Sequence, residues 1–208
     1  MRANLTRKEF FGKDDTRPLV WRNLFFPTEI LNALDVSMLT METYAALFAR
    51  NQRRIKKAFD NATYKGFAAE TCSFLRVLEG MDLPKPDYGV STSEPCQQGE
   101  RILRDLSRSY GVADKFFSLH TPAEHNPLTL EQVAEGLEKS VHEMEKALGL
   151  KMDMKKLAVA CELSNEARDV TNQINDLRLS SPPLIPGSLA VYFASIFSQL
   201  WGKPELVE

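Results

Sequence analysis

Short apolar runs alternate with helix-like segments along the first half of the chain. The apolar runs lie at residues 18–21, 36–41, 88–92 and 115–119, and each is followed by a segment with helical spacing. Short strands that alternate with helices are typical of a parallel sheet with helices on its faces. From Thr129 onward only helical spacing occurs. We therefore predict an α/β fold: a small, mostly parallel, Rossmann-like sheet with flanking helices, followed by a helical extension.

This change of pattern suggests three parts. We predict an N-terminal extension at residues 1–16, an α/β domain at 17–122 and a helical region at 123–208. Within them, Thr28 is predicted to cap a helix, Thr129 and Gln132 to form a capping box, and residues 44–59 to form one long helical region. A last apolar helix is predicted after the break at Pro182 and Pro183.

Composition narrows the class of protein. The 208 residues are 43% hydrophobic, which is enough for a proper core, and the net charge of −2 favours neither a nucleic acid nor an anionic membrane as partner. We expect no signal peptide, because residues 1–8 lead into no apolar run, and no membrane span. Three cysteines, an odd number, argue against a disulfide framework. We interpret the chain as a soluble cytoplasmic protein.

Two of the cysteines are predicted to stand where a strand or loop passes into a helix. Cys72 and Cys96 each precede a helical segment, and in alternating α/β chains ligands gather at the carboxyl ends of the strands. A helix N-terminus favours the thiolate that binds metals, so both are candidate ligands of an iron–sulfur cluster. Their spacing matches no recognised metal motif, which leaves open that they are small buried residues. Cys161 lies on an apolar helix stripe, and we predict it in the core.

Other polar residues give weaker signals. The histidines form no ligand-spaced pair: His120, His125 and His142. A basic run is either a phosphate contact or, as we favour, a solvated helix face: Arg50, Arg53, Arg54, Lys56 and Lys57. Because no Gly-rich phosphate loop, Walker sequence or nucleophile elbow is present, a classical nucleotide-binding enzyme is unsupported.

A series of short segments extends over nearly the whole chain after residue 17. In order they are FPTEILNAL at 26–34, ME at 41–42, CSFLR at 72–76 with Gly80, PKPDY at 84–88, STS at 91–93 before Cys96, FFSLHTP at 116–122, NEAR at 165–168 and PPLIPG at 182–187. This ordered set resembles the subunit family of 2-hydroxyacyl-CoA dehydratases, of the 2-hydroxyglutaryl-CoA dehydratase D-component type, and ATP-dependent benzoyl-CoA reductases. The chain resembles the N-terminal half of such a subunit.

The resemblance implies a specific chemistry. Subunits of that family pair as heterodimers, each with two α/β domains, and cysteine thiolates hold a 4Fe-4S cluster in the crevice between the domains. A separate ATP-dependent activator protein injects one electron, and the acyl-CoA substrate becomes a ketyl radical that loses a proton and its 2-hydroxyl group. By this resemblance Cys72 and Cys96 are cluster ligands, and Ser73 is a catalytic neighbour in the site. An oxygen-sensitive lyase component of anaerobic metabolism is expected.

The sequence also departs from the family pattern. Gln97 follows Cys96 where the family commonly has Asp, and a typical subunit is nearly twice as long, its second α/β domain supplying the third cysteine ligand. Three hypotheses therefore remain: a dehydratase component complemented by a C-terminal half, a benzoyl-CoA reductase subunit, or a truncated non-catalytic interaction module without a cluster. The residues do not identify the acyl chain of the substrate.

Overall fold

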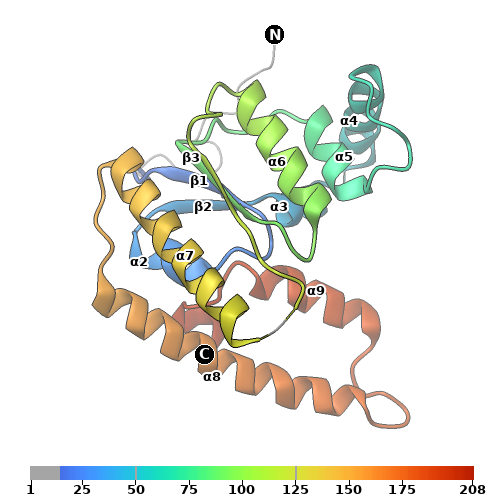
Figure 1. Cartoon of the computed structure of the whole chain (residues 1–208). Coiled ribbons are helices and arrows are strands. Elements are labelled where there is room, and N and C mark those ends of the chain that lie inside the picture. The colour runs from blue at the N-terminus through green and yellow to red at the C-terminus, as the bar shows by residue number, and fades with distance from the viewer. Residues whose placement is uncertain (1–14, 50, 125) are drawn as a thin grey trace. The chain divides into compact units, whose positions relative to one another are not determined.

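The computed structural model describes residues 15–49, 51–124 and 126–208, so most of the predicted extension at 1–16 lies outside the described residues. The predicted α/β class with a helical C-terminal region is confirmed (Figure 1). The chain forms two compact units. The first holds the described residues up to Phe26 together with Val36–Leu150, and the second holds Pro27–Asp35 and Lys151–Glu208.

The first unit is built on a four-stranded sheet. Its strands are β1 (Leu19–Arg22), β2 (Ser37–Thr40), β3 (Tyr88–Thr92) and β4 (Phe116–Leu119), in the order β2-β1-β3-β4. All three pairings are parallel. The central strands β1 and β3 are buried along their whole length, as parallel strands covered on both faces should be. Strand order changes direction between β1 and β3, which makes the carboxyl ends of these two strands a topological switch point.

Five helices of the first unit have the following bounds: α3 (Met41–Phe48), α4 (Gln52–Tyr64), α5 (Ser73–Gly80), α6 (Gln97–Ser109) and α7 (Pro127–Leu148). The single long helical region predicted for residues 44–59 is wrong, because the Asn51 side chain accepts a hydrogen bond from the amide of Arg54 and starts α4 anew. The capping box of α7 is also displaced: Asn126 and Thr129 form it instead of Thr129 and Gln132.

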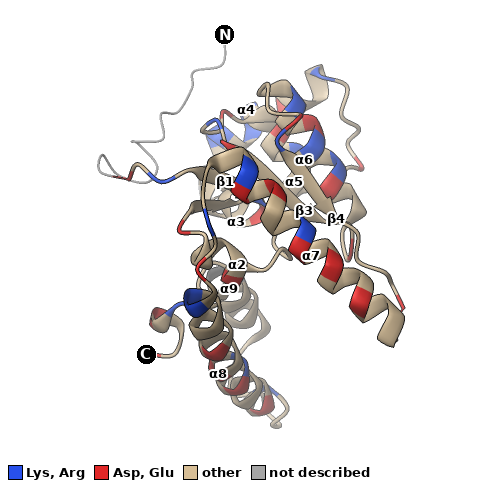
Figure 2. Ribbon diagram, turned by 60° about the vertical axis from the view of Figure 1, so that its left-hand side comes forward, with Lys and Arg blue, Asp and Glu red and all other residues tan. Residues whose placement is uncertain are grey.

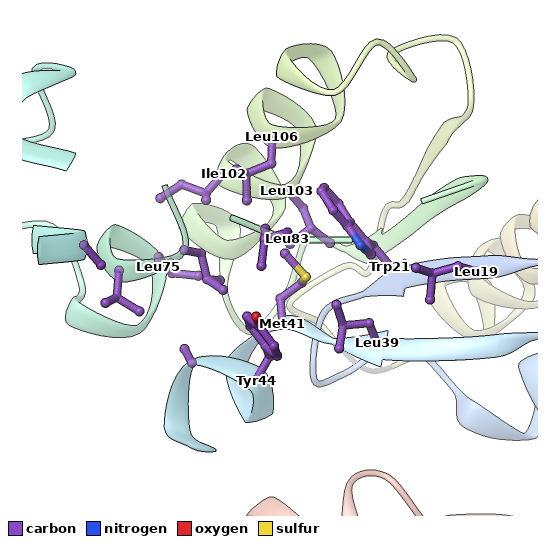
Figure 3. Packing of buried hydrophobic residues seen from close by; sticks show 14 residues of the cluster. Leu19, Trp21, Leu39, Met41, Tyr44, Leu75, Leu83, Ile102, Leu103 and Leu106 are labelled. Carbon is purple, nitrogen blue, oxygen red and sulfur yellow. The ribbon is translucent and has the colours of Figure 1, made fainter. Parts of the chain in front are cut away.

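One face of the sheet packs on α3, α5 and α6 (Figure 3). Trp21 is at the centre: its indole nitrogen donates to the Pro84 carbonyl at 3.1 Å, and its ring meets that of Tyr110 edge-on at 5.0 Å. The Tyr110 hydroxyl in turn accepts from the amide of Leu83 at 2.9 Å. These contacts hold the chain that follows α5 against the C-terminal end of α6. Helix α7 packs on β3 and β4.

The second unit consists of α2 (Thr28–Ala33), α8 (Met154–Arg178), α9 (Gly187–Phe197) and a 3-10 turn at Pro204–Leu206. Small residues on α8, namely Ala160, Ser164 and Ala167, form its buried face, and α2 packs on this helix. Thr28 does not cap α2, contrary to the prediction. It is the first helical residue, and its hydroxyl donates to the carbonyl of Trp201 at 2.9 Å.

The units do not follow the order of the chain. Helix α7 belongs with the sheet, whereas α2, which joins β1 to β2, belongs with α8. The boundary at residue 122 between the predicted α/β domain and the predicted helical region stays a prediction from the sequence. Among the described residues, no helix combines the length and the apolar character that crossing a bilayer requires.

The packing of α4 on α5 depends on the absence of a side chain at Gly80. A Cβ placed there would lie 1.8 Å from the carbonyl oxygen of Ala58, a backbone atom that cannot move aside on its own. We expect Gly80→Ala to lower the free energy of unfolding by about 3 kcal/mol, because the two helices must separate. Urea unfolding followed by circular dichroism measures this. Gly187→Ala is the matched control, since nothing lies within 4 Å of its Cβ position. Equal unfolding midpoints for the two variants would contradict the prediction.

Candidate functional site

The carboxyl ends of β1 and β3 are joined by one buried amide side chain. The oxygen of Asn23 accepts from the amide of Thr92 at 3.3 Å and from that of Phe26 at 3.2 Å. Its nitrogen donates to the carbonyl and the hydroxyl of Thr92 at 3.2 and 3.1 Å. Asn23 therefore fixes the backbone on both sides of the switch point.

A buried arginine joins β1 to β2 at the same edge. Arg22 is 1% exposed, and its Nε donates to the hydroxyl of Thr40 at 2.7 Å. One of its terminal nitrogens donates to the carbonyls of Phe26 and Leu24. A buried guanidinium is tolerated only when its donors are satisfied, so these bonds define the shape of the loop that leaves β1.

Glu42, in the first turn of α3, places a carboxyl group beside this arginine. One of its oxygens, Oε2, is buried and has no hydrogen-bond partner among the described residues. Burial raises the pKa of Glu42 above its ordinary value; its own amide, the charge of Arg22 and the amide of Leu24 act in the opposite direction without cancelling the effect. A carboxyl group in such surroundings keeps its proton more readily than a carboxyl group at the surface does.

Cys96 and Glu42 both come close to Gly99 in the first turn of α6. Cys96 is the N-cap of α6, its sulfur accepts a hydrogen bond from the amide of Gly99 at 3.3 Å, and it is partly buried against the core. A Cβ at Gly99 would lie 3.3 Å from Cys96 Sγ and 3.6 Å from Glu42 Oε1. Glycine at this position therefore leaves a small space that the sulfur and the carboxylate both border. Sulfur at a helix N-terminus with an amide donor is well placed to ligate a metal.

Cys72 stands immediately before α5, as predicted, and is exposed. Its carbonyl accepts hydrogen bonds from the amides of Leu75 and Arg76 at 3.1 and 2.8 Å. Its thiol makes no capping hydrogen bond to the first turn of α5. Helices α5 and α6 pack on each other, and the Leu83–Tyr110 hydrogen bond joins them at their C-terminal side. The cysteines occupy the opposite, N-terminal ends. Ser73, the predicted catalytic neighbour, is the exposed first residue of α5.

The prediction that Cys161 is a core residue is wrong. It is exposed on α8, because the buried face of that helix runs through Ala160, Ser164 and Ala167 instead. Although the residue as a whole is exposed, partial desolvation raises the pKa of its thiol, and the negative charge of Glu29 adds to this. Cys161 is thus less inclined than an ordinary cysteine to present a thiolate.

The first unit carries two thiols of the kind that ligate iron–sulfur clusters. Cys72 and Cys96 provide sulfur donors at two helix N-termini, and the space at Gly99 borders one of them. Within the described ranges, however, no three side chains of His, Cys, Asp or Glu come together as a metal site. The chemistry of these two sulfur donors suits an iron–sulfur cluster.

Polar residues also gather where β3 and β4 end. Ser93 Oγ lies 3.4 Å from Nδ1 of His120, and it accepts from the amide of Thr121 at 3.0 Å. No sequence pattern predicts a role for Arg22, Asn23 or Glu42. The segment ME at 41–42 belongs to the family resemblance, but no local pattern distinguishes the Glu42 carboxyl group from one at the surface.

The basic run from Arg53 to Lys57 lies on α4. Lys56 pairs with Asp60 at 2.7 Å on an exposed face of α4, in keeping with a solvated surface. Arg50 and His125 lie outside the described residues.

Comparison with known proteins identifies relatives of this chain. A family model described as 2-hydroxyglutaryl-CoA dehydratase, D-component, matches residues 23–208. The alpha subunit of (R)-2-hydroxyisocaproyl-CoA dehydratase from Clostridioides difficile is 25% identical over 170 residues, an alignment that covers 76% of this chain and 41% of that subunit. The chain thus spans less than half the length of this curated relative.

The buried carboxyl group of Glu42 should reduce stability at neutral pH. Its folded-state pKa is raised above the ordinary 4.5, so the folded protein binds the proton more tightly than the unfolded chain does. The resulting stability is present at low pH and is lost as pH rises through the folded-state pKa. We expect Glu42→Gln to unfold at higher urea than the parent at pH 8, with the difference shrinking toward pH 5. A difference that grows as pH falls would contradict this.

Proposed function

Since the chain belongs to the 2-hydroxyglutaryl-CoA dehydratase D-component family, we propose that it is an iron–sulfur component of a 2-hydroxyacyl-CoA dehydratase. The observation that carries this proposal is the placement of Cys96 beside Glu42 at the carboxyl edge of a parallel sheet, with Cys72 at the start of the neighbouring helix. This edge includes the switch point at which open α/β sheets bind ligands.

The proposed reaction removes the 2-hydroxyl group and a β-proton from a 2-hydroxyacyl-CoA, giving an enoyl-CoA and water. An ATP-dependent activator protein provides the electron that starts the reaction, and the electron returns at its end. A 4Fe-4S cluster held by Cys72, Cys96 and ligands from another segment supplies electron transfer and a Lewis-acid position for substrate oxygen when bound.

The residues of this chain prepare the site for proton transfer. Burial favours the protonated form of the Glu42 carboxyl group, which borders the same small space at Gly99 as Cys96 and is the candidate proton donor and acceptor. The positive charge of Arg22 lies close enough to lower the pKa of Glu42 against the larger effect of burial. The hydroxyl of Ser73, exposed at the N-terminus of α5, is available as a hydrogen-bond donor to substrate.

The proposed assembly contains more than this chain. The curated relative is named an alpha subunit, and we propose a homologous dehydratase subunit as the partner in a heterodimer. The remaining cluster ligands then come from the part of a dehydratase subunit that this chain does not span.

Cysteine substitution tests the cluster assignment. The chain, copurified with its partner polypeptides, is reconstituted anaerobically with iron and sulfide, and its iron content and visible absorption are measured. We expect Cys72→Ser and Cys96→Ser each to lose most of the iron and of the absorption near about 400 nm that thiolate-ligated clusters show. Cys161→Ser, the matched control on the second unit, should retain both. Equal iron in all three variants would refute the assignment, and a parent chain that retains no iron would favour a non-catalytic interaction module.

Glu42→Gln separates proton transfer from cluster binding. The variant should retain the iron and the colour of the parent, since Glu42 is not a proposed ligand. Its activator-dependent dehydration rate should fall by about 10²-fold or more, because general acid–base catalysis contributes on that scale. Asp105→Asn, on the same helix as Cys96 and paired with Arg108 at 2.9 Å on the exposed face of α6, is the control and should keep its rate. An unchanged rate in Glu42→Gln excludes this residue from proton transfer. Assaying benzoyl-CoA reduction with the same preparation distinguishes a dehydratase component from a benzoyl-CoA reductase subunit.

A further inference from the structure

One aromatic side chain is exposed in the otherwise buried loop after β1. Phe25 is 44% exposed, whereas Arg22, Asn23 and Phe26 are almost wholly buried. The backbone that follows Phe25 is fixed, because the Phe26 amide donates to the Asn23 side chain at 3.2 Å and the Phe26 carbonyl accepts from Arg22. The loop therefore holds Phe25 in place without burying its ring. Single exposed apolar residues are common on protein surfaces, so the position of Phe25 decides whether it has a role.

Phe25 is next in sequence to a residue that contacts Glu42. The amide of Leu24 donates a hydrogen bond to the Glu42 carboxyl group. Glu42 Oε1 in turn lies 3.6 Å from the Cβ position at Gly99, and Cys96 Sγ lies 3.3 Å from the same position. Short contacts thus join the loop after β1, the candidate proton donor and the N-terminus of α6, and Phe25 is one residue from the first of them.

The positive charge of Arg22, which acts on Glu42, is not open to a substrate. The guanidinium is 1% exposed and donates to the Thr40 hydroxyl and to the carbonyls of Leu24 and Phe26. A substrate carboxylate that leaves water at this edge needs a cation with donors to spare. Arg22 does not provide one, because the protein itself engages its guanidinium.

The arginines at the start of α6 are not directed at this edge. They alternate with acidic residues along the helix (Figure 2). Arg101 comes two residues after Gly99, which is about 200° around an α-helix and so on another side from Glu42. Arg104 pairs with Glu100 at the helix surface. Within the described part of the chain, the positive charges of β1 and of the first two turns of α6 are thus turned away or already engaged.

We propose that Phe25 contacts the acyl chain of the substrate and makes the site selective for 2-hydroxyacyl-CoA molecules whose acyl chain ends in an apolar group, against those that end in a carboxylate. The inference rests on the proposed function, with Glu42 as proton donor and acceptor. Consecutive Cα atoms are about 3.8 Å apart. Phe25 is therefore within reach of the carbons that lie beyond the β-carbon of a substrate placed at Glu42.

The selectivity follows from what each kind of chain end gains and loses when it leaves water. An alkyl or aryl end covers the exposed part of the Phe25 ring and is favoured by apolar burial. A carboxylate end loses its hydration, meets no unused cation and comes close to a second acidic group, Glu42. The coenzyme A portion is the same in both kinds of substrate, so discrimination falls on the far end of the acyl chain.

Isothermal calorimetry with two non-reacting probes tests this inference. Isocaproyl-CoA and glutaryl-CoA lack the 2-hydroxyl group and cannot be dehydrated, and each is titrated into the chain copurified with its partner polypeptides. We expect the parent to bind isocaproyl-CoA at least about tenfold more tightly than glutaryl-CoA. Phe25→Arg should reverse this preference, because it removes apolar surface and adds a cation. Phe25→Leu, which keeps an apolar side chain, should preserve it.

Leu130→Arg is the matched control, because Leu130 is 72% exposed on α7 of the same unit; it should keep the parent's ratio of affinities. Circular dichroism should show all variants equally folded. The inference is overturned if the parent binds neither probe, or binds glutaryl-CoA as tightly as isocaproyl-CoA or more tightly. It is also overturned if Phe25→Arg leaves the ratio unchanged, or if Leu130→Arg changes it equally.

The acyl contact and the dehydratase function fail in different measurements. A parent that prefers isocaproyl-CoA through Phe25 but shows no activator-dependent dehydration would reject the dehydratase function and leave the acyl contact in place. Dehydration by a parent whose ratio of affinities does not respond to Phe25→Arg would do the reverse.

Discussion

The buried guanidinium of Arg22 is the interaction on which the site depends. It binds the Thr40 hydroxyl at the end of β2 and the Phe26 carbonyl in the loop after β1, so two strand ends and one loop are fixed by one side chain. A buried charge is costly unless its donors are used. The hydrogen bonds that satisfy these donors determine where the chain turns after both strands. They also place the positive charge of Arg22 near Glu42, and this charge lowers the pKa of Glu42 against the larger effect of burial.

Close packing of backbone connects this edge to the cysteines. Gly80 lets α5 approach α4, and the Tyr110–Leu83 hydrogen bond holds the chain after α5 against the C-terminal end of α6. The N-termini of α5 and α6, with Cys72 and Cys96, are thereby positioned by contacts made away from them. A site held by rigid elements in this way can include a group such as Glu42, whose burial opposes folding, because the surrounding core compensates for it.

The two units are held together by different kinds of packing. The first encloses large side chains such as Trp21 and Leu103 between a sheet and its helices. The second has a close helix contact built on small residues and extends into a hairpin whose apolar side chains are left exposed. The first unit therefore has a core of its own, whereas residues 168–194 of the second unit contribute no buried side chain.

Local sequence patterns were sufficient to predict the parallel sheet, the order of its elements along the chain, and the position of Cys72 and Cys96 before helices. This is because periodicity and helix starts depend on residues that are near in sequence. They misplaced Cys161, since helical spacing shows which residues share a face but not which face is covered. They also gave no sign that Glu42 lies beside Cys96 or that α2 packs on α8. Those relations arise when crossover connections bring distant segments together, and burial, which sets the pKa of Glu42, exists only after they have met.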